Sequence, residues 1–127
     1  MNNIPIVARF VLTILFMTLL VGVSIVPGRA QPGDSVFVFI VANTPTAIQK
    51  LLHLALYAML TLMWVWTLEA MQSRPARLLI AALIAVILGA SMEWYQTRVP
   101  GRFGTIVDVA LNAAGAALGL IAAIVLL

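Results

Sequence analysis

Four long apolar runs constrain this chain more than any other feature of its sequence. They cover residues 5–26, 47–69, 76–96 and 106–127, and few charged side chains interrupt them. An α-helix rises about 1.5 Å per residue, so a run of this length crosses a hydrocarbon core of roughly 30 Å. We therefore predict an all-α membrane protein with four transmembrane helices and short connections.

The composition excludes several other classes of protein. Of the 127 residues, 64% are hydrophobic and only 9% are charged, which is outside the usual balance of a soluble domain. The absence of cysteine excludes disulfides, thiolate nucleophiles and cysteine metal ligands. The formal net charge is +3, but the seven Lys and Arg residues stand singly at the ends of apolar runs. They are typical of membrane flanks, and we expect no nucleic-acid partner.

The first run has features of a signal peptide as well as of a transmembrane helix. Gly28 and Ala30 offer small residues at the two positions that a signal peptidase inspects, and Arg9 supplies an amino-terminal charge. However, the run is longer than the roughly 7 to 15 apolar residues of a signal peptide. We expect it to be retained as the first spanning helix, whereas a mature amino terminus at Gln31 would show cleavage.

A connection rich in proline and glycine follows, and it contains the apolar segment Ser35 to Ala42. This segment of eight residues is too short to span a membrane. We interpret it as a loop lying in the headgroup region. The alternative is a lid or re-entrant piece over a functional site.

The second helix is expected to begin at Thr44 and Pro45, which have the pattern of an N-cap followed by proline at the first helical position. Near its start lie Lys50, His53 and Tyr57, and their spacing places them on one face of the helix. His53 is expected to bond a neighbouring helix, with proton transfer or metal ligation as the alternative. Tyr57 is expected to be an interface aromatic, with a catalytic role as the alternative.

Aromatic residues are predicted to mark the two membrane interfaces. Trp64 and Trp66 mark one side, and Trp94 and Tyr95 mark the other. Glu69 stands close to two arginines of the following turn, and we interpret it as a solvated helix end.

Two stripes of small residues predict close helix packing. Ala85, Gly89 and Glu93 are spaced by four, so small side chains lead up to the acid on one helix face. On the fourth helix, Gly115-x-x-x-Gly119 lets another helix approach closely. A homo-oligomer through these two glycines is one expectation.

The fourth helix starts with a polar turn. Thr105 and Asp108 have the spacing of a capping box, so Asp108 has a structural role that can coexist with a functional one. Asp108 also shares a helix face with Asn112 and the two glycines.

Polar residues that are scattered in the sequence are expected to meet at one side of the membrane. Successive spanning helices alternate in direction, so the start of the second, the end of the third and the start of the fourth lie together. A charge near the bilayer centre costs roughly 2.5 to 3.5 kcal/mol on insertion scales. We therefore predict that Glu93, Arg102 and Asp108 approach one another. The residues gathered at this side are Lys50, His53, Glu93, Gln96, Arg98, Arg102, Asp108 and Asn112.

The distribution of basic residues gives a prediction of orientation. The side of the two termini carries Arg9, Arg74 and Arg77, and the other side carries Arg29, Lys50, Arg98 and Arg102. This raw count is indecisive. If the carboxylate cluster holds the last three cations, the remaining count is three against one. We therefore predict that both termini are cytoplasmic and that the polar cluster faces outward.

The order of the polar residues resembles that of the VanZ-like family. The pattern is Lys50-x-x-His53-x-x-x-Tyr57, then Glu93-x-x-Gln96, then Arg102, Asp108, Asn112, Gly115 and Gly119. The resemblance is strongest over residues 44–120 and implies a single VanZ-like membrane domain over residues 1–127. Members of this family are small bacterial membrane proteins associated with resistance to teicoplanin and related lipoglycopeptides. The resemblance therefore implies a multi-pass protein of the bacterial inner membrane, within the cell envelope, with a role in antibiotic resistance.

Two main classes of function fit these residues. In the first, which is not enzymatic, an outward-facing cleft binds an anionic lipid headgroup or a cell-wall precursor phosphate through Lys50, Arg98 and Arg102. In the second, a membrane enzyme acts on a headgroup or phosphate, with His53 or Glu93 as general base and Arg102 stabilising negative charge. No nucleophile motif supports an enzyme, so we favour binding.

The remaining candidates complete the predicted site. Asp108 is a third candidate for catalysis, and Tyr57, Gln96 and Asn112 complete the expected binding set. Arg102 paired with an acid can equally be an ion pair that fixes the bundle. No cofactor is expected, and no metal site, because one His and two carboxylates lack a close ligand spacing. A small transporter subunit ranks last, because the polar residues occupy only one side of the membrane.

Overall fold

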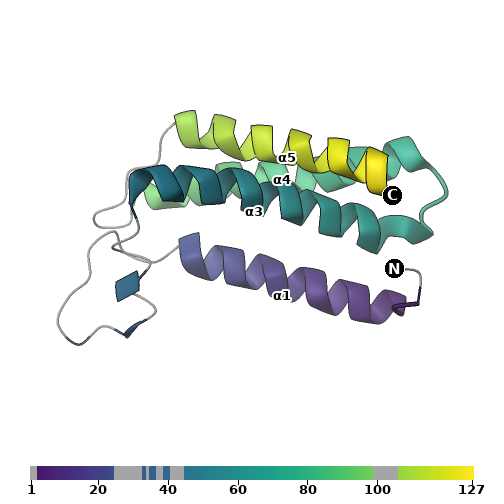
Figure 1. The fold of residues 1–127 in the computed structure, drawn as a ribbon, viewed down its shortest axis with the longest axis horizontal. Helices are drawn as coiled ribbons and strands as arrows, with labels where there is room; N and C mark the ends of the chain where they lie inside the picture. The colour runs from purple at the N-terminus through teal and green to yellow at the C-terminus, as the bar shows by residue number, and fades with distance from the viewer. Residues whose placement is uncertain (1–2, 25–32, 34, 37–38, 41–44, 99–105) are drawn as a thin grey trace.

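The structure consists of long helices that run antiparallel to their neighbours in the chain (Figure 1). It is a computed structural model, and it describes residues 3–24, 33, 35–36, 39–40, 45–98 and 106–127. The helices are α1 (Ile6–Ser24), α3 (Thr46–Thr67), α4 (Arg74–Gln96) and α5 (Ile106–Leu126), and a 3-10 turn, η1 (Leu68–Ala70), extends α3. Each of the four helices is long and apolar enough to cross a membrane. The predicted all-α fold is confirmed, and the chain is a multi-pass membrane protein.

Two helix starts differ from the predicted ones by one or two residues. Pro45 is the N-cap of α3 and not its first helical residue, and Thr44 lies outside the described residues. The third predicted helix, expected from residue 76, begins earlier, at Arg74, because the Ser73 hydroxyl caps the helix by accepting a hydrogen bond of 3.3 Å from the Ala76 N–H. The polar turn before α4 is therefore partly helical. The capping box predicted at Thr105 lies outside the described residues.

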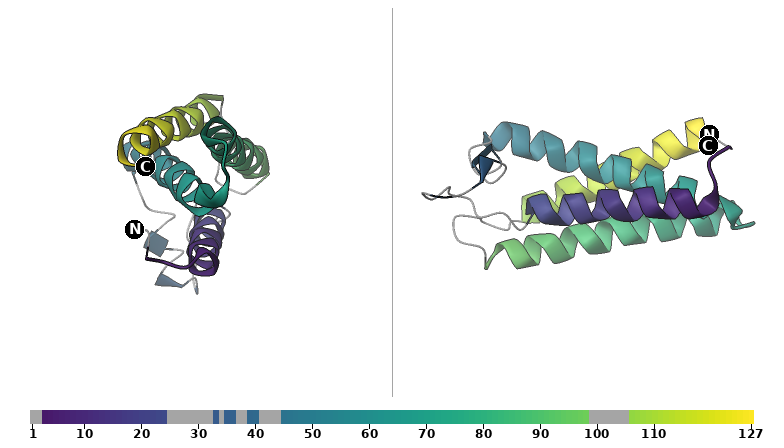
Figure 2. Two further views of the ribbon diagram at one scale, coloured as in Figure 1. Left: turned by 90° about the vertical axis from the view of Figure 1, so that its right-hand side faces the viewer. Right: turned by 90° about the horizontal axis from the view of Figure 1, so that it is seen from below.

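Helix α3 is the centre of the bundle. It packs against α1, α4 and α5, whereas α1 contacts α3 and, less extensively, α4 (Figure 2). Helices α3, α4 and α5 form a tight group, and α1 lies along one side of it. Residues of α1, α3 and α4 can therefore line a space between α1 and the other helices.

The glycines of α5 make the contact between α5 and α3 possible. A Cβ atom on Gly115 would meet the backbone carbonyl oxygen of Leu54, and one on Gly119 would meet that of Ala58. The predicted close approach is confirmed, and the partner is α3 of the same chain. The glycine face is thus occupied within the chain, and a homo-oligomer would have to use a different surface.

The small-residue stripe of α4 is also buried as predicted. Ala81, Ala85 and Gly89 face the core, and Glu93 continues the stripe with only 2% of its surface exposed. A Cβ atom on Gly89 would lie 2.9 Å from the Cβ atom of Asn112, which is closer than real side chains come. The missing side chain at Gly89 therefore makes room for Asn112 beside α4.

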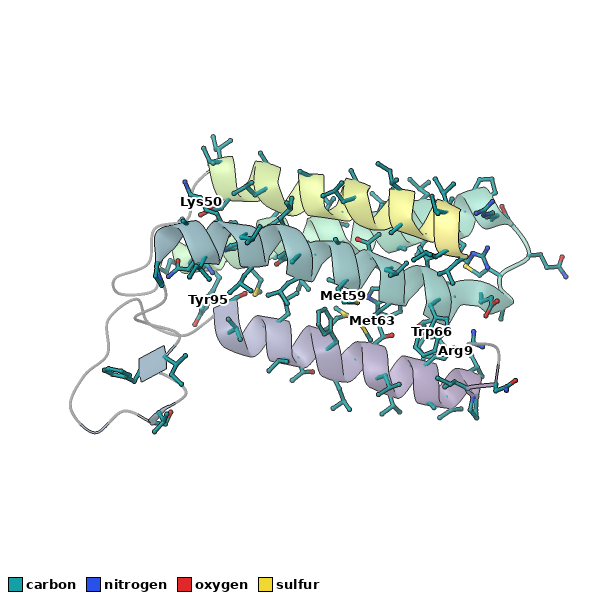
Figure 3. All side chains as sticks on the ribbon, viewed as in Figure 1. Arg9, Lys50, Met59, Met63, Trp66 and Tyr95 are labelled. Atoms are coloured by element: carbon teal, nitrogen blue, oxygen red, sulfur yellow. The ribbon has the colours of Figure 1, made fainter. Side chains whose placement is uncertain are left out.

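At the end of the bundle that holds both termini, Arg9 joins α1 to α3 (Figure 3). Arg9 is only 7% exposed, forms an ion pair with Glu69, and donates hydrogen bonds to the carbonyl oxygens of Ile4 (3.0 Å) and Trp66 (3.2 Å). Its guanidinium also lies over the Trp66 ring, 5.1 Å from the centroid. Glu69 lies at an exposed helix end, as predicted, but its ion pair with Arg9 was not predicted. A buried arginine needs such a partner.

Two further contacts hold α1 against α3 on this side of the bundle. The hydroxyl groups of Thr13 and Thr67 lie 2.6 Å apart, one helical turn beyond the Arg9 pair. Trp64 is 8% exposed and donates its indole N–H to the sulfur of Met17 at 3.2 Å. It is a core residue that packs on α1, and its prediction as an interface marker was wrong. Trp94 and Tyr95 are exposed, in agreement with their predicted place at an interface.

Candidate functional site

The polar residues gather at the end of the bundle opposite the two termini. The start of α3, the end of α4 and the start of α5 lie together there (Figure 1). Their side chains differ in exposure: Glu93, Gln96 and Asn112 are buried, His53 and Asp108 are half-buried, and Lys50 and Arg98 are exposed. Arg102 lies outside the described residues. The predicted convergence is thus seen for the residues that the structure describes.

His53 connects three helices at this end. Its Nδ1 atom lies 2.7 Å from Oδ1 of Asn112 on α5 and 3.8 Å from Oε1 of Glu93 on α4. Its ring is stacked parallel to that of Tyr57, one turn further along α3, with the centroids 6.4 Å apart. Tyr57 is 2% exposed, so the prediction that it is an interface aromatic was wrong. The His53 imidazole therefore has Asn112 and Glu93 beside its Nδ1 atom and Tyr57 beside one face of its ring.

The two described cations of the predicted set lie outside this cluster. Arg98 lies over the ring of Trp94, 4.2 Å from its centroid, and both side chains are exposed. Among the described residues, neither Lys50 nor Arg98 forms an ion pair with a carboxylate. The expectation that the carboxylates hold these two cations was wrong, because both extend toward the surface. The predicted grouping of Arg102 with the acids is not tested.

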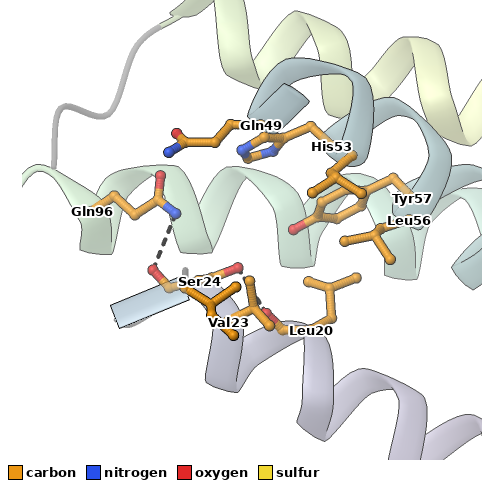
Figure 4. A pocket seen from close by; sticks show the side chains of 10 residues that line it. Leu20, Val23, Ser24, Gln49, His53, Leu56, Tyr57 and Gln96 are labelled. Atoms are coloured by element: carbon orange, nitrogen blue, oxygen red, sulfur yellow. Dashed lines mark hydrogen bonds between the residues drawn. The ribbon is translucent and has the colours of Figure 1, made fainter. Parts of the chain in front are cut away.

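A cavity of about 310 Å³ lies beside His53, between α1 and the start of α3 (Figure 4). Its walls are mainly apolar, and its polar groups come from three helices. The Gln96 amide donates a hydrogen bond of 3.1 Å to the Ser24 carbonyl oxygen and so joins α4 to α1 at the cavity. The lining residues are Leu20, Val23, Ser24, Ile40, Gln49, Leu52, His53, Leu56, Tyr57 and Gln96.

Comparison with known protein families identifies the chain. A family model described as VanZ/LLP1 matches residues 9–127. The chain belongs to the VanZ/LLP1 family. The match includes α1, which carried none of the polar pattern that suggested the resemblance. Comparison with curated proteins and with solved structures gave no match.

In this VanZ/LLP1 protein the cavity includes residues that sequence reasoning missed. Gln49 lines it, and its position four residues before His53 on the same helix face was a usable signal. Lys50, the predicted neighbour, projects to the surface. Ser24 and Ile40 also line the cavity. No pattern in the sequence indicated that α1 would reach it, whereas a lid over a functional site was the alternative interpretation of the Ser35 to Ala42 segment.

The site contains buried polar groups that have no hydrogen-bond partner within the part of the chain that the structure describes. Examples are the hydroxyl of Tyr57, which also lines the cavity, and the Nδ2 amide group of Asn112. Leaving a buried polar group unsatisfied costs about 1 to 3 kcal/mol. Such groups are suited to bind a ligand. The described residues contain no group of three His, Asp or Glu side chains close enough to hold a metal ion.

Proposed function

We propose that this VanZ/LLP1 protein is a non-enzymatic envelope factor that binds an anionic lipid headgroup or a cell-wall precursor phosphate. The observation that carries the proposal is the cavity between α1 and α3, which combines apolar walls with a polar end. A ligand that fills it favourably has to be amphiphilic, because polar groups buried against apolar walls without partners are costly.

The lining residues divide by chemistry. Leu20, Val23 and Leu56 offer apolar surface to a hydrocarbon or glycerol backbone, while His53 and Gln49 offer hydrogen-bonding groups to a polar head. They come from the last part of α1 and the first half of α3 and surround the same cavity (Figure 4). This arrangement suits a lipid that enters from the side, with its tail in the bilayer and its head at His53.

The surrounding charges support a phosphate-bearing head. Lys50 and Arg98 are exposed at the same end of the bundle, and neither is paired with a carboxylate in the described part of the chain. Exposed cations raise the local concentration of anionic ligands through their long-range field. Their field would attract an anionic headgroup to this end of the bundle.

The proposal places the protein in the bacterial inner membrane with the cavity end facing outward. Arg74 and Arg77 in the short turn before α4 favour a cytoplasmic location for that end, whereas Lys50 and Arg98, which no described carboxylate holds, count for the opposite orientation. A reporter fused after Leu127 therefore tests the orientation. A lipid or precursor bound at the outer face is consistent with the association of VanZ-like proteins with teicoplanin resistance.

Lipid analysis of the purified protein tests this function. Leu52 lines the cavity and is partly exposed, so Leu52→Trp should fill the cavity with little strain on the core. Leu51 is the matched control, because it is exposed on the same helix turn and does not line the cavity. We expect a phosphate-containing lipid to co-purify with wild type and Leu51→Trp and to be depleted in Leu52→Trp. Equal lipid content in the two variants would contradict binding in this cavity.

A second candidate function is catalysis on a lipid headgroup or phosphate. The contact between His53 Nδ1 and Asn112 favours it, because a general base is most effective when its other ring nitrogen is held by an acceptor. Comparison of lipid and precursor species in cells with and without the protein separates the two functions. A changed molecular species supports catalysis, whereas unchanged species with a co-purifying lipid support binding.

A further inference from the structure

The surroundings of His53 determine which of its nitrogens carries the proton. Both neighbours of Nδ1 are oxygen atoms, Oδ1 of Asn112 at 2.7 Å and Oε1 of Glu93 at 3.8 Å. A lone pair on Nδ1 would face these two acceptors, so Nδ1 carries the hydrogen. In the neutral imidazole the lone pair is then on Nε2.

The carboxylate of Glu93 also decides the orientation of the Asn112 amide. If the amide were reversed, its NH₂ group would donate to Nδ1, and the Nδ1 lone pair would face the Glu93 oxygen at 3.8 Å. The arrangement with the Asn112 oxygen as acceptor avoids this repulsion. Asn112 and Glu93 are therefore positioning residues that act on a ligand through His53.

The cavity offers two hydrogen-bonding groups that the protein leaves open. His53 lines the cavity, and within the described residues its Nε2 makes no hydrogen bond. Tyr57 is 2% exposed, its hydroxyl has no partner there, and the hydroxyl points toward the cavity between His53 and α1 (Figure 4). The pair consists of one acceptor, Nε2, and one hydroxyl that can donate.

We propose that the cavity selects phosphate headgroups whose esterified alcohol carries a hydrogen-bond donor, either an ammonium or a hydroxyl group. The donor bonds Nε2 of His53, and a phosphate or ester oxygen accepts from the Tyr57 hydroxyl. This inference rests on the proposed binding of a lipid in the cavity and names the chemistry that the site recognises. A quaternary ammonium head has no donor and leaves Nε2 unsatisfied.

A headgroup methylation series tests the selection at constant charge. The probes are phosphatidylethanolamine, its N-methyl and N,N-dimethyl derivatives and phosphatidylcholine, each presented to the purified protein in mixed detergent micelles. We expect binding of phosphatidylcholine to be roughly 2- to 12-fold weaker than that of phosphatidylethanolamine, the effect of one hydrogen bond. Phosphatidylglycerol tests whether a hydroxyl donor is sufficient, because its headgroup carries hydroxyl groups and no ammonium.

A variant of His53 separates hydrogen bonding from headgroup size. His53→Leu removes the acceptor, so the preference for phosphatidylethanolamine over phosphatidylcholine should disappear. A preference that persists unchanged in His53→Leu reflects size and overturns the inference.

The single histidine of this chain allows its protonation to be observed directly. In protein labelled with ¹⁵N-histidine we expect the neutral ring to carry its hydrogen on Nδ1, and phosphatidylethanolamine, but not phosphatidylcholine, to shift the Nε2 resonance. Asn112→Ala, which leaves only the more distant Glu93 oxygen near Nδ1, should raise the share of the Nε2–H tautomer, while Asn112→Asp, which keeps an acceptor in contact, should keep the hydrogen on Nδ1. A change in folding alone would not give this rescue.

The outcomes distinguish the inference from the function on which it rests. Binding of all the lipids with equal affinity, or a hydrogen on Nε2, overturns the selection and leaves lipid binding standing. Binding of none of them overturns the selection together with binding of phospholipid headgroups, and leaves only the cell-wall precursor of the proposed function.

Discussion

Nδ1 of His53 lies 2.7 Å from Oδ1 of Asn112, although 59 residues separate them in the sequence. The contact joins α3 to α5 inside the bundle and fixes the imidazole at the cavity. Asn112 reaches this position because Gly89 on α4 has no side chain in its way. The site therefore depends on how far α3, α4 and α5 are shifted along their axes relative to one another.

We expect the free energies of unfolding of His53 and Asn112 variants to be coupled. In a double-mutant cycle of His53→Leu and Asn112→Leu, measured by unfolding in detergent, the coupling energy should be about 0.5 kcal/mol or more. The same cycle of His53→Leu with Ser91→Ala should be additive, because the Ser91 hydroxyl bonds only its own helix. Additivity of both cycles would argue against a structural role for the contact.

Gly119→Ala should destabilise the bundle by about 1 to 3 kcal/mol, the usual cost of overpacking. The added Cβ would meet the Ala58 carbonyl oxygen and lie 2.8 Å from the Thr61 Cβ atom. Gly119→Leu should lower the folded yield in the membrane still further. The matched control is Gly22→Ala, since a Cβ there would have no atom within 4 Å. Equal thermal stability of the two alanine variants in detergent would refute tight packing at Gly119.

Glu69→Gln should destabilise the attachment of α1 by roughly 1 to 3 kcal/mol, because the guanidinium of buried Arg9 loses its charged partner. The measurement is thermal unfolding in detergent together with protease sensitivity of α1. The double variant Arg9→Met with Glu69→Leu should recover much of the loss, since apolar residues of similar size can replace a buried pair. Full stability of Glu69→Gln alone would show that the pair contributes little.

His53→Gln should accumulate normally but lose the phenotype, whether lipoglycopeptide tolerance or another envelope trait. Gln is similar in size and polarity, so folding is spared, but it cannot reproduce an imidazole with Nδ1 on Asn112 and Nε2 at the cavity. Leu51→Ala, exposed on the same end of α3 and outside the cavity lining, controls for a general effect on this end of α3. If His53→Gln protects cells as well as wild type, His53 has only a structural role.

A periplasm-only reporter fused after Leu127 should be inactive, and a cytoplasmic reporter at the same place should be active. Both termini lie at one end of the bundle, and the start of α3, which carries His53, lies at the other (Figure 2), so this result would also place the cavity at the outer face. Periplasmic activity would reverse the orientation, and the cavity would then face the cytoplasm.

The sequence by itself determined the number and approximate limits of the helices, because the length and hydropathy of a spanning segment are local properties. It also determined which ends of α3, α4 and α5 meet, since successive spans must alternate in direction. The spacing of Ala85, Gly89 and Glu93 identified the buried face of α4, because the helical period converts spacing into direction. The grouping of Arg102 with the acids remains a prediction from the same reasoning.

Only the tertiary structure decided the partners of individual polar residues. Arg9 and Glu69 each had a plausible solvated role, and their pairing depends on the packing of α1 against α3. Tyr57 and Trp64 are aromatic residues that suit an interface or a core equally well, and the neighbouring helices place both in the core. Likewise, the Gly115 and Gly119 motif allows any helix to approach, and the structure shows that this helix is α3.

The cavity was the feature that could be predicted least from the sequence. It forms where α1, which has no polar motif at this end, lies against α3 and α4, so its lining depends on the rotation and depth of three helices. Helix periodicity could relate Gln49 to His53, but it could not place Leu20 or Ser24 opposite them. Hydropathy determines that helices span a membrane, and side-chain packing between them determines where a ligand can bind.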